Sequence, residues 1–243
     1  MLTRREPLEL NTGTTASASL IAGCAVNAAP LIEQTSHRTW PLPETAWFLF
    51  MHWHDLLFLH WPVRPETIRP LIPRVLELDT FDGWCWIGIV PFSHERCSTA
   101  LPSDPFGFSR AERPHLREDT AQDRCLVLQP GCGLAVRAAR WLGMPYYNAR
   151  MKVGSAGESV DYKSLRDHKK AAAAEFEATY APTGETYMAQ TGTLDHWLTE
   201  RYCLFSALKP DRIVFGEIHH PQWCLQPARV ELRSCTMLPG LGD

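Results

Sequence analysis

Arginine and tyrosine side chains in the second half of the chain offer the clearest means of binding a ligand. An arginine inside a protein selects a carboxylate or a phosphate, because its planar guanidinium donates to two oxygen atoms at once. We therefore expect a small anionic ligand. Taken singly, however, each arginine is more often a surface or ion-paired residue. The candidate ligand-binding residues are Arg150, Tyr146, Tyr162, Arg166, Arg201, Tyr202 and His219.

Histidines suggest a second kind of site, a metal centre. His52 and His54 are two residues apart, so on a strand they face the same side. With His60 or His219 they could bind zinc, iron or nickel. The neighbouring acid, Asp55, would face the opposite side. We therefore favour hydrogen-bonded histidines within an aromatic-rich strand, and we predict no metal site.

Nucleophilic chemistry has weaker support. His94 and Cys97 could form a Cys/His pair only if the imidazole reaches the thiol in space, which spacing does not show. Lys169 and Lys170 form an adjacent lysine pair, but they follow Asp167 and His168 in a charged segment typical of a solvent-exposed turn. The sequence contains no Gly-x-Ser-x-Gly elbow, phosphate-binding loop or dinucleotide fingerprint. It therefore predicts neither a cofactor nor a defined catalytic residue.

The composition limits the class of protein. A hydrophobic content of 45% can form a substantial core, and a net charge of −3 gives no basic surface for nucleic acid. The eight cysteines include no Cys-x-x-Cys pair, which favours free thiols in a reducing cytoplasm. The apolar stretch from Trp47 to Trp61 is too short and too polar to span a membrane. We expect a cytoplasmic protein without membrane or nucleic-acid partners, and the sequence does not specify an oligomeric state.

Most of the chain has the alternating, aromatic-rich patterns of β-strands, with a hairpin turn at Asp82 and Gly83. The expected strands are residues 47–61, 76–92, 146–153, 159–166, 171–180, 201–208 and 212–219, and the fifth of these is ambiguous with helix. The expected short helices are residues 65–71, 134–142 and 194–199, the last with Thr193 as its N-cap. Because βαβ alternation is absent, this pattern predicts an α+β domain built on a mainly antiparallel, β-barrel-like sheet.

The predicted domain begins near residue 46. Residues 1–45 are rich in Thr, Ser and Ala and lack periodicity, so we expect a disordered N-terminal extension. The true start of the protein could then lie near Met51. Residues 46–243 would form a single β-rich domain.

Several blocks of sequence resemble the YqjF-like family of uncharacterised bacterial proteins. They are residues 53–92, residues 134–151, Leu-Thr-Glu-Arg-Tyr-Cys-Leu at 198–204 and Glu-Ile-His-His-Pro-Gln-Trp at 217–223. The resemblance covers about residues 47–240 and implies a fold of the acetoacetate-decarboxylase-like superfamily. It also implies a keto-acid-like ligand in a barrel cavity.

The superfamily's named enzyme decarboxylates a β-keto acid through a lysine Schiff base. Its lysine pair follows a Gly-Tyr-Pro element, which we match to residues 143–145, so that Tyr146 and Tyr147 stand where the lysines would be. A phenol cannot form an imine. The resemblance therefore implies the fold but not the decarboxylase chemistry, and a decarboxylase-type lyase is a disfavoured alternative.

Residues 109–132 are anomalous, because they are charged and aperiodic between core strands. The family would read Pro-Glu-Leu-Asn-Val-Arg-Thr-Tyr-Val and then Gly-Val-Trp-Phe-Phe-Ser-Leu-Asp-Ala here. Possible codons read one base later permit the first peptide across residues 108–117 and the second across residues 124–132. A long surface loop is the simpler interpretation of this segment. The resemblance instead leads us to hypothesise a frame-shifted segment that would replace two core strands, and a non-functional product is then the alternative to ligand binding. The chain also ends where the family continues, so we expect a truncated C-terminus.

Overall fold

The structure is a computed structural model that describes residues 17–21, 33–44, 49–99, 147–169, 171–209 and 212–237. Its main sheet contains β1 (Ser17–Ile21), β3 (Leu57–Val63), β4 (Cys85–Ile89), β6 (Ala149–Ala156), β7 (Ser159–Arg166), β8 (Glu175–Pro182), β9 (Tyr187–Met188) and β12 (Cys224–Cys235). Two separate two-stranded sheets pair β2 (Leu49–His54) with β5 (Ser93–Thr99), and β10 (Cys203–Lys209) with β11 (Arg212–Glu217), and the second of these is a hairpin. The helices are α2 (Pro65–Ile68), the 3-10 turn η1 (Arg69–Leu71) and α4 (Leu194–Thr199).

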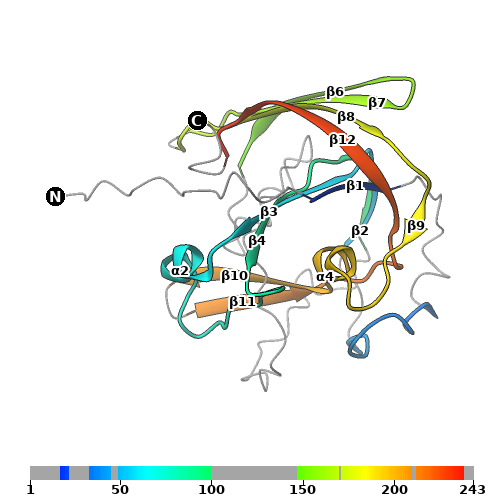
Figure 1. The fold of residues 1–243 in the computed structure, drawn as a ribbon. Coiled ribbons are helices and arrows are strands. Elements are labelled where there is room, and N and C mark those ends of the chain that lie inside the picture. The colour runs from blue at the N-terminus through cyan, green and yellow to red at the C-terminus, as the bar shows by residue number, and fades with distance from the viewer. Residues whose placement is uncertain are drawn as a thin grey trace.

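The described elements form three layers (Figure 1). Strands β6, β7 and β8 make the upper layer, β1, β3 and β4 the middle layer, and α4 with the β10–β11 hairpin the lower layer. All strand pairs in the described residues are antiparallel. The predicted antiparallel sheet with a few short helices is therefore confirmed.

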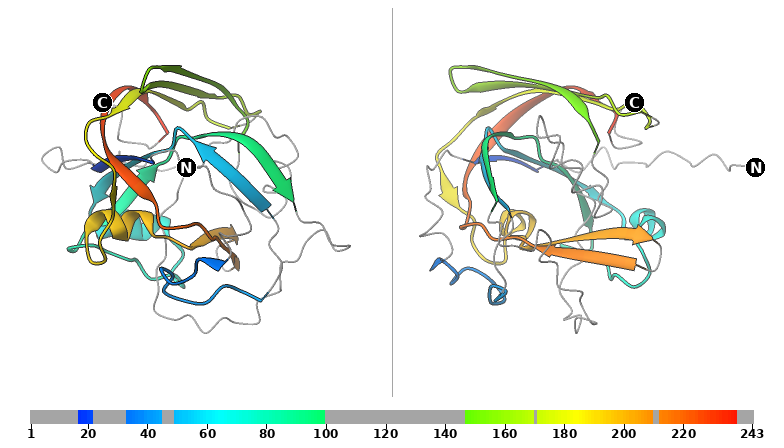
Figure 2. Two further views of the ribbon diagram at one scale, coloured as in Figure 1. Left: turned by 90° about the vertical axis from the view of Figure 1, so that its right-hand side faces the viewer. Right: turned by 180° about the vertical axis from the view of Figure 1, so that it is seen from behind.

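Strand β12 belongs to two layers at once. Its first residues pair with β9 and β1, whereas the residues from Ala228 onward pair with β8. The eight-stranded sheet, in the order β4-β3-β1-β12-β8-β7-β6, therefore curves around its own concave side (Figure 2). Within the described residues β4 and β6 do not pair with each other, and no closed barrel is detected there. The barrel-like closure of the sheet therefore stays a prediction.

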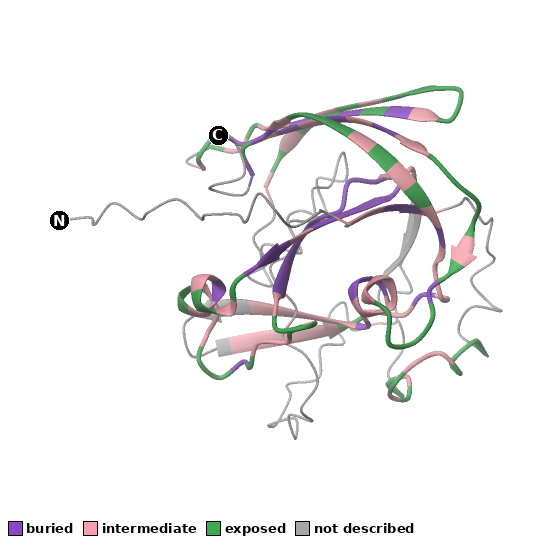
Figure 3. Ribbon diagram, viewed as in Figure 1, coloured by how far each residue is buried: buried purple, intermediate pink, exposed green. Residues whose placement is uncertain are grey.

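Burial differs between the layers as this arrangement requires. On β7 and β8 every second residue is buried and the residues between them are partly or fully exposed. On β3 and β4 nearly every residue is buried (Figure 3). A strand covered on both faces reads as a continuous apolar run, whereas a strand covered on one face alternates. The dense apolar block around residues 57–63 is therefore explained by its place in the middle layer.

The lower face of β3 and β4 carries a buried histidine. His60 pairs directly opposite Gly88, and Trp86 is its diagonal neighbour on the same face. A Cβ atom on Gly88 would lie 2.6 Å from Cδ2 of the His60 ring, so only glycine leaves room for the imidazole. Burial, and after it the positive charge of Arg201, lowers the pKa of His60 to about 4. The ring is therefore neutral at physiological pH.

Part of the N-terminal region that we predicted to be disordered is a strand. Residues 17–21 form β1, which pairs with β3 on one side and β12 on the other. In the described sheet, β1 is the strand whose pairing joins β3 to β12. A boundary at residue 46 therefore divides a single sheet. A strand of five residues, three of them Ser or Ala, carries little strand signal on its own, because its pairing partners lie far away in the sequence.

Other predicted elements differ in detail. The expected strand 47–61 is two strands, β2 and β3, separated at Asp55, whose backbone φ is 54°. The expected hairpin at 76–92 is reduced to a single bridge between Phe81 and Trp84 followed by β4. Thr193 is confirmed as the N-cap of α4, because its side chain accepts from the His196 amide. The helix at 134–142, the segment 109–132 and the chain end after residue 237 lie outside the described residues.

In the ranges that the structure describes, no helix has both the length and the apolar character required to cross a bilayer.

We predict that Gly88→Ala lowers the free energy of unfolding by about 1–3 kcal/mol, because the new methyl group overlaps the confined His60 ring. The matched control is Gly154→Ala on β6, where an added Cβ meets no atom within 4 Å. Urea unfolding of both variants measures the difference. Equal effects at the two positions would contradict the close contact between Gly88 and His60.

We also predict that acid destabilises the protein through His60. The folded-state pKa of about 4 lies below the ordinary histidine value of 6.5, so the unfolded chain takes up this proton first as the pH falls. The free energy of unfolding should therefore decrease between these two pH values, by up to about 3 kcal/mol for this ring.

The variant His60→Phe should show a shallower decrease over the same pH range, and urea unfolding at pH 7 and pH 4.5 measures it. The control is His54→Phe, at an exposed histidine on β2. An unchanged pH dependence in His60→Phe would show that the ring binds its proton as readily in the folded state as in the unfolded chain.

Candidate functional site

The predicted ligand-binding residues separate into two groups. The first group lies on β6 and β7 and consists of Arg150, Tyr162 and Arg166. The second group lies next to the β10–β11 hairpin and consists of Arg201, Tyr202 and His219. Tyr146 lies outside the described residues. The structure therefore does not bring these residues into one common cavity.

Two members of the first group have ordinary structural surroundings. The Arg150 side chain is 73% exposed and its Nε lies 3.4 Å from Asp167, which is 66% exposed. Such a surface pair contributes little to stability. Tyr162 is buried, and its hydroxyl donates to the Phe92 carbonyl at 3.2 Å. Burial raises the pKa of Tyr162. Arg150 is thus a surface residue and Tyr162 a core residue.

Arg166 differs from both. Its guanidinium lies 4.2 Å from the centre of the Tyr147 ring, and its Nη1 donates to the Ala172 carbonyl at 3.3 Å. Its Nε is buried and has no hydrogen-bond acceptor. A buried donor without an acceptor is unfavourable, so this atom marks a position where a ligand oxygen would be stabilised.

Two carboxylates in the segments around Arg166 are paired with other cations. Asp167 faces Arg150, and Glu175 lies 3.1 Å from the Nζ atom of Lys163. Among the residues that the structure describes, Arg166 therefore has no acidic partner. Within that part of the chain no carboxylate neutralises its positive charge.

Ser164 adds a second unsatisfied group on the same face of β7. It lies two residues before Arg166, so both side chains point to the concave side of the sheet. Ser164 is completely buried, and its hydroxyl has no hydrogen-bond partner. Sequence reasoning missed this residue. The available signal was the spacing of two residues from Tyr162 and from Arg166, which places the Ser164 hydroxyl on the buried face of the strand.

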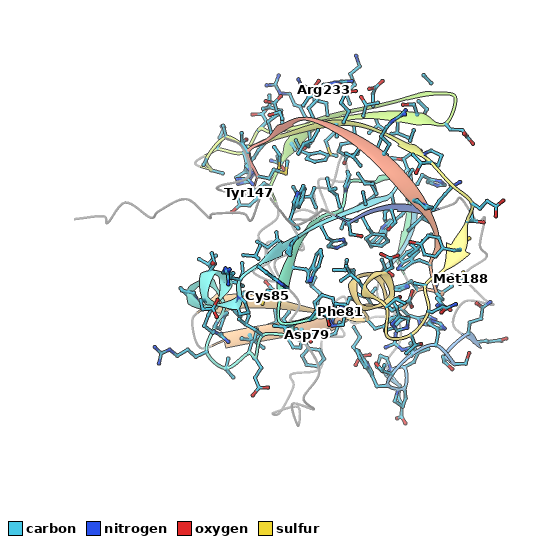
Figure 4. The ribbon with its side chains drawn as sticks, in the orientation of Figure 1. Asp79, Phe81, Cys85, Tyr147, Met188 and Arg233 are labelled. Carbon is cyan, nitrogen blue, oxygen red and sulfur yellow. The ribbon has the colours of Figure 1, made fainter. Side chains whose placement is uncertain are left out.

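We define the Arg166 site as Arg166, Ser164 and Tyr147. Figure 4 shows Tyr147 at one end of the upper layer, near the start of β6. The Tyr147 ring supports the guanidinium on one side and meets the His168 ring edge-on at 5.6 Å. The site thus combines one cation and one hydroxyl without a neutralising carboxylate, which is suited to a single negative charge.

In the second group the cation is already paired. Arg201 Nη1 lies 2.6 Å from Oδ2 of Asp79, and the guanidinium lies 3.9 Å from the Trp197 ring. The Arg201 side chain is 14% exposed. An anion would have to displace Asp79 from this arginine, so Arg201 is the weaker candidate.

Tyr202 is the first ring of an aromatic stack. Its ring lies 4.6 Å from His220, and His220 lies 4.4 Å from Trp223. The Tyr202 hydroxyl donates to the Glu200 carboxylate, and burial raises the pKa of Tyr202. His219, by contrast, packs beside His37 at 5.8 Å. These contacts give Tyr202 and His220 a structural role.

Histidines and cysteines in the described residues do not gather into a metal centre. No group of three or more His, Cys, Asp or Glu side chains in those residues could hold a metal ion. His54 is exposed and His60 is buried, and the side chains of His52, His94 and Cys97 lie outside the described part.

Comparisons with known proteins agree with the resemblance seen in the sequence. The model of the family DUF2071, described as "Uncharacterized conserved protein (COG2071)", matches residues 50–242. The chain is also 34% identical over 218 residues to "Uncharacterized protein YqjF" from Bacillus subtilis (strain 168), covering 87% of this chain and 89% of the relative. No solved structure matches the chain. This protein therefore belongs to the DUF2071 family.

Proposed function

We propose that this protein binds a small monoanionic, keto-acid-like molecule at the Arg166 site. The observation that carries the proposal is an arginine without an acidic partner in the described residues, two positions from a fully buried hydroxyl that is also unpaired. A carboxylate can accept from the guanidinium through one or both oxygens and from the Ser164 hydroxyl as well. Binding would therefore satisfy two buried donors together.

The surroundings of Ser164 support a short ligand with an apolar end. In the sheet Ser164 pairs with Met151 on β6 and with Phe176 on β8. Phe176 is completely buried in the main core. A ligand with its carboxylate at Arg166 would therefore place a short acyl group against apolar side chains. This favours a small keto acid over a phosphate or a long polyanion.

The lysines of the described part do not support the alternative of a Schiff-base lyase. A lysine nucleophile needs a lowered pKa, which burial or a nearby cation provides. Lys152 and Lys169 are exposed. The hydrogen bond from Lys163 to Glu177 raises the pKa of Lys163, which is the opposite effect. We therefore propose binding and assign no covalent chemistry to the site.

Replacing Arg166 should weaken binding selectively. We expect Arg166→Gln to reduce the affinity for pyruvate or acetoacetate at least about 10-fold, which corresponds to about 1.4 kcal/mol. Arg150→Gln is the matched control, because Arg150 lies on the neighbouring strand but is exposed. Isothermal titration calorimetry measures both variants, with acetone as the uncharged probe.

The proposal fails if native protein binds acetone as tightly as pyruvate, if neither keto acid binds, or if Arg150→Gln weakens binding as much as Arg166→Gln.

Replacing Ser164 should have opposite effects on stability and on binding. Without ligand, Ser164→Ala removes a buried, unpaired hydroxyl, so the free energy of unfolding should stay the same or rise by up to about 1 kcal/mol. With pyruvate, the affinity should fall about 3- to 10-fold, because one donor to the carboxylate is lost. Ser159→Ala, at the other end of β7, is the control. A loss of stability in ligand-free Ser164→Ala would indicate that the hydroxyl serves the fold instead.

A further inference from the structure

A short segment before the family domain lies against the connection between β11 and β12. We call residues 33–44 the N-terminal strap. Figure 2 shows it in blue beside that connection. His37 Nε2 lies 2.8 Å from the His220 carbonyl oxygen, which ties the strap to the connection. The strap precedes the residues that the family model matches, whereas its contact surface lies within them.

One side chain makes most of the strap's polar contacts with the domain. The Arg38 side chain is only 1% exposed. Its Nη1 donates to the Ile218 carbonyl at 2.7 Å and lies 3.4 Å from His219 Nδ1. Its Nη2 lies 3.4 Å from Oε2 of Glu217. The guanidinium carbon lies 4.7 Å from the centre of the Tyr202 ring.

These contacts match a guanidinium in particular. The planar group lies against an aromatic face while separate nitrogens reach a carbonyl and a carboxylate. An ammonium group is a point charge and cannot make the same set of contacts. Burial lowers the pKa of Arg38, and the charge of Glu217 opposes this change. The domain therefore offers a shape and a charge that select an arginine side chain.

The rest of the strap is attached more weakly. Residues 33–36 are exposed, and so are Thr39, Pro41, Pro43 and Glu44. Surface hollows lie along the strap. One is lined by residues 33–37 together with Met188, Pro221 and Gln222, and another by Thr35 and residues 38–42. The rings of His37 and Trp40 lie 5.6 Å and 6.1 Å from the Tyr202 ring. The strap is therefore held mainly through His37, Arg38 and Trp40, and its exposed residues add little to the attachment.

We propose that Tyr202, Glu217, Ile218 and His219 form a guanidinium-binding site, which Arg38 fills in this state. When the strap detaches, the site accepts an arginine side chain from a partner peptide. The occupant packs on Tyr202, which is the first ring of the stack through His220 to Trp223. Occupation of the site therefore also orders the segment that carries Arg201. This site is separate from the Arg166 site and does not depend on its function.

Chemical rescue tests the site in the full chain. We expect Arg38→Ala to lower the Tm by about 5 °C, since it removes charged hydrogen bonds and ring contact. Millimolar ethylguanidinium should restore at least half of that loss, whereas ethylammonium at the same concentration should not. The control, Arg74→Ala, removes an exposed arginine and should show neither the loss nor the rescue. Adding Glu217→Gln to Arg38→Ala should abolish the rescue.

Equal effects of the two cations on Arg38→Ala would overturn the proposal. If this variant does not fold alone, its refolding yield with each cation decides the same question. The peptide of residues 33–44 provides the second probe, compared with the same peptide carrying Arg38→Lys. The arginine peptide should bind the Arg38→Ala protein at least about 10-fold more tightly than it binds native protein, where the strap competes. No preference for the arginine peptide over the lysine peptide would also overturn it.

Discussion

The continuity of β12 through two layers is the constraint on which the rest of the fold depends. Because its first residues pair with β1 and its later residues pair with β8, the sheet must curve, and its concave side becomes the main core. The same curvature covers β3 and β4 on both faces. One face meets the core and the other carries His60 opposite Gly88. The lower layer, with α4 and the β10–β11 hairpin, then lies beneath that second face. A change in the pairing of β12 would therefore affect both faces of the middle layer at once.

Whether an arginine is already paired separates structural arginines from candidate ligand-binding ones. The described part contains arginines with very different surroundings. Arg201 lies 2.6 Å from Asp79, and Arg150 pairs with Asp167 at the surface. Arg38 reaches Glu217 from the strap. Arg166 has an aromatic neighbour and one carbonyl acceptor but no carboxylate in the described residues. Only the Nε atom of Arg166 is buried, so an anion that binds there would satisfy this donor while part of the guanidinium stays exposed to solvent.

The sequence predicts the strands of the upper layer better than those of the middle layer. Alternation identified β7, because only one of its faces is buried. For β8 the alanine run left residues 171–180 ambiguous with helix, and the strand is Glu175–Pro182. The continuous apolar run before residue 63 hid the break at Asp55, since strands buried on both faces carry no periodic signal. Strand β1 was missed because its stability comes from β3 and β12, far away in the sequence. Contacts between residues that are distant in the sequence also decide which candidate arginine is paired. The sequence alone does not distinguish Arg166 from Arg201. The fold does, because it places Asp79 beside Arg201.

The contact between Tyr147 and Arg166 places a cation beside the position that we match to the superfamily's lysine pair. In the superfamily that the sequence resembles, a lysine is made nucleophilic by a neighbouring cation that lowers its pKa. Here a cation lies against the position that we match to the lysine pair, but the residue there is a phenol. The guanidinium then has no amine whose pKa it could lower. Its charge, together with the buried Ser164 hydroxyl, can instead hold a carboxylate in place. With phenols in place of both lysines, covalent chemistry on a keto acid is lost at this position, whereas the charge of Arg166 is compatible with the reversible binding that we propose.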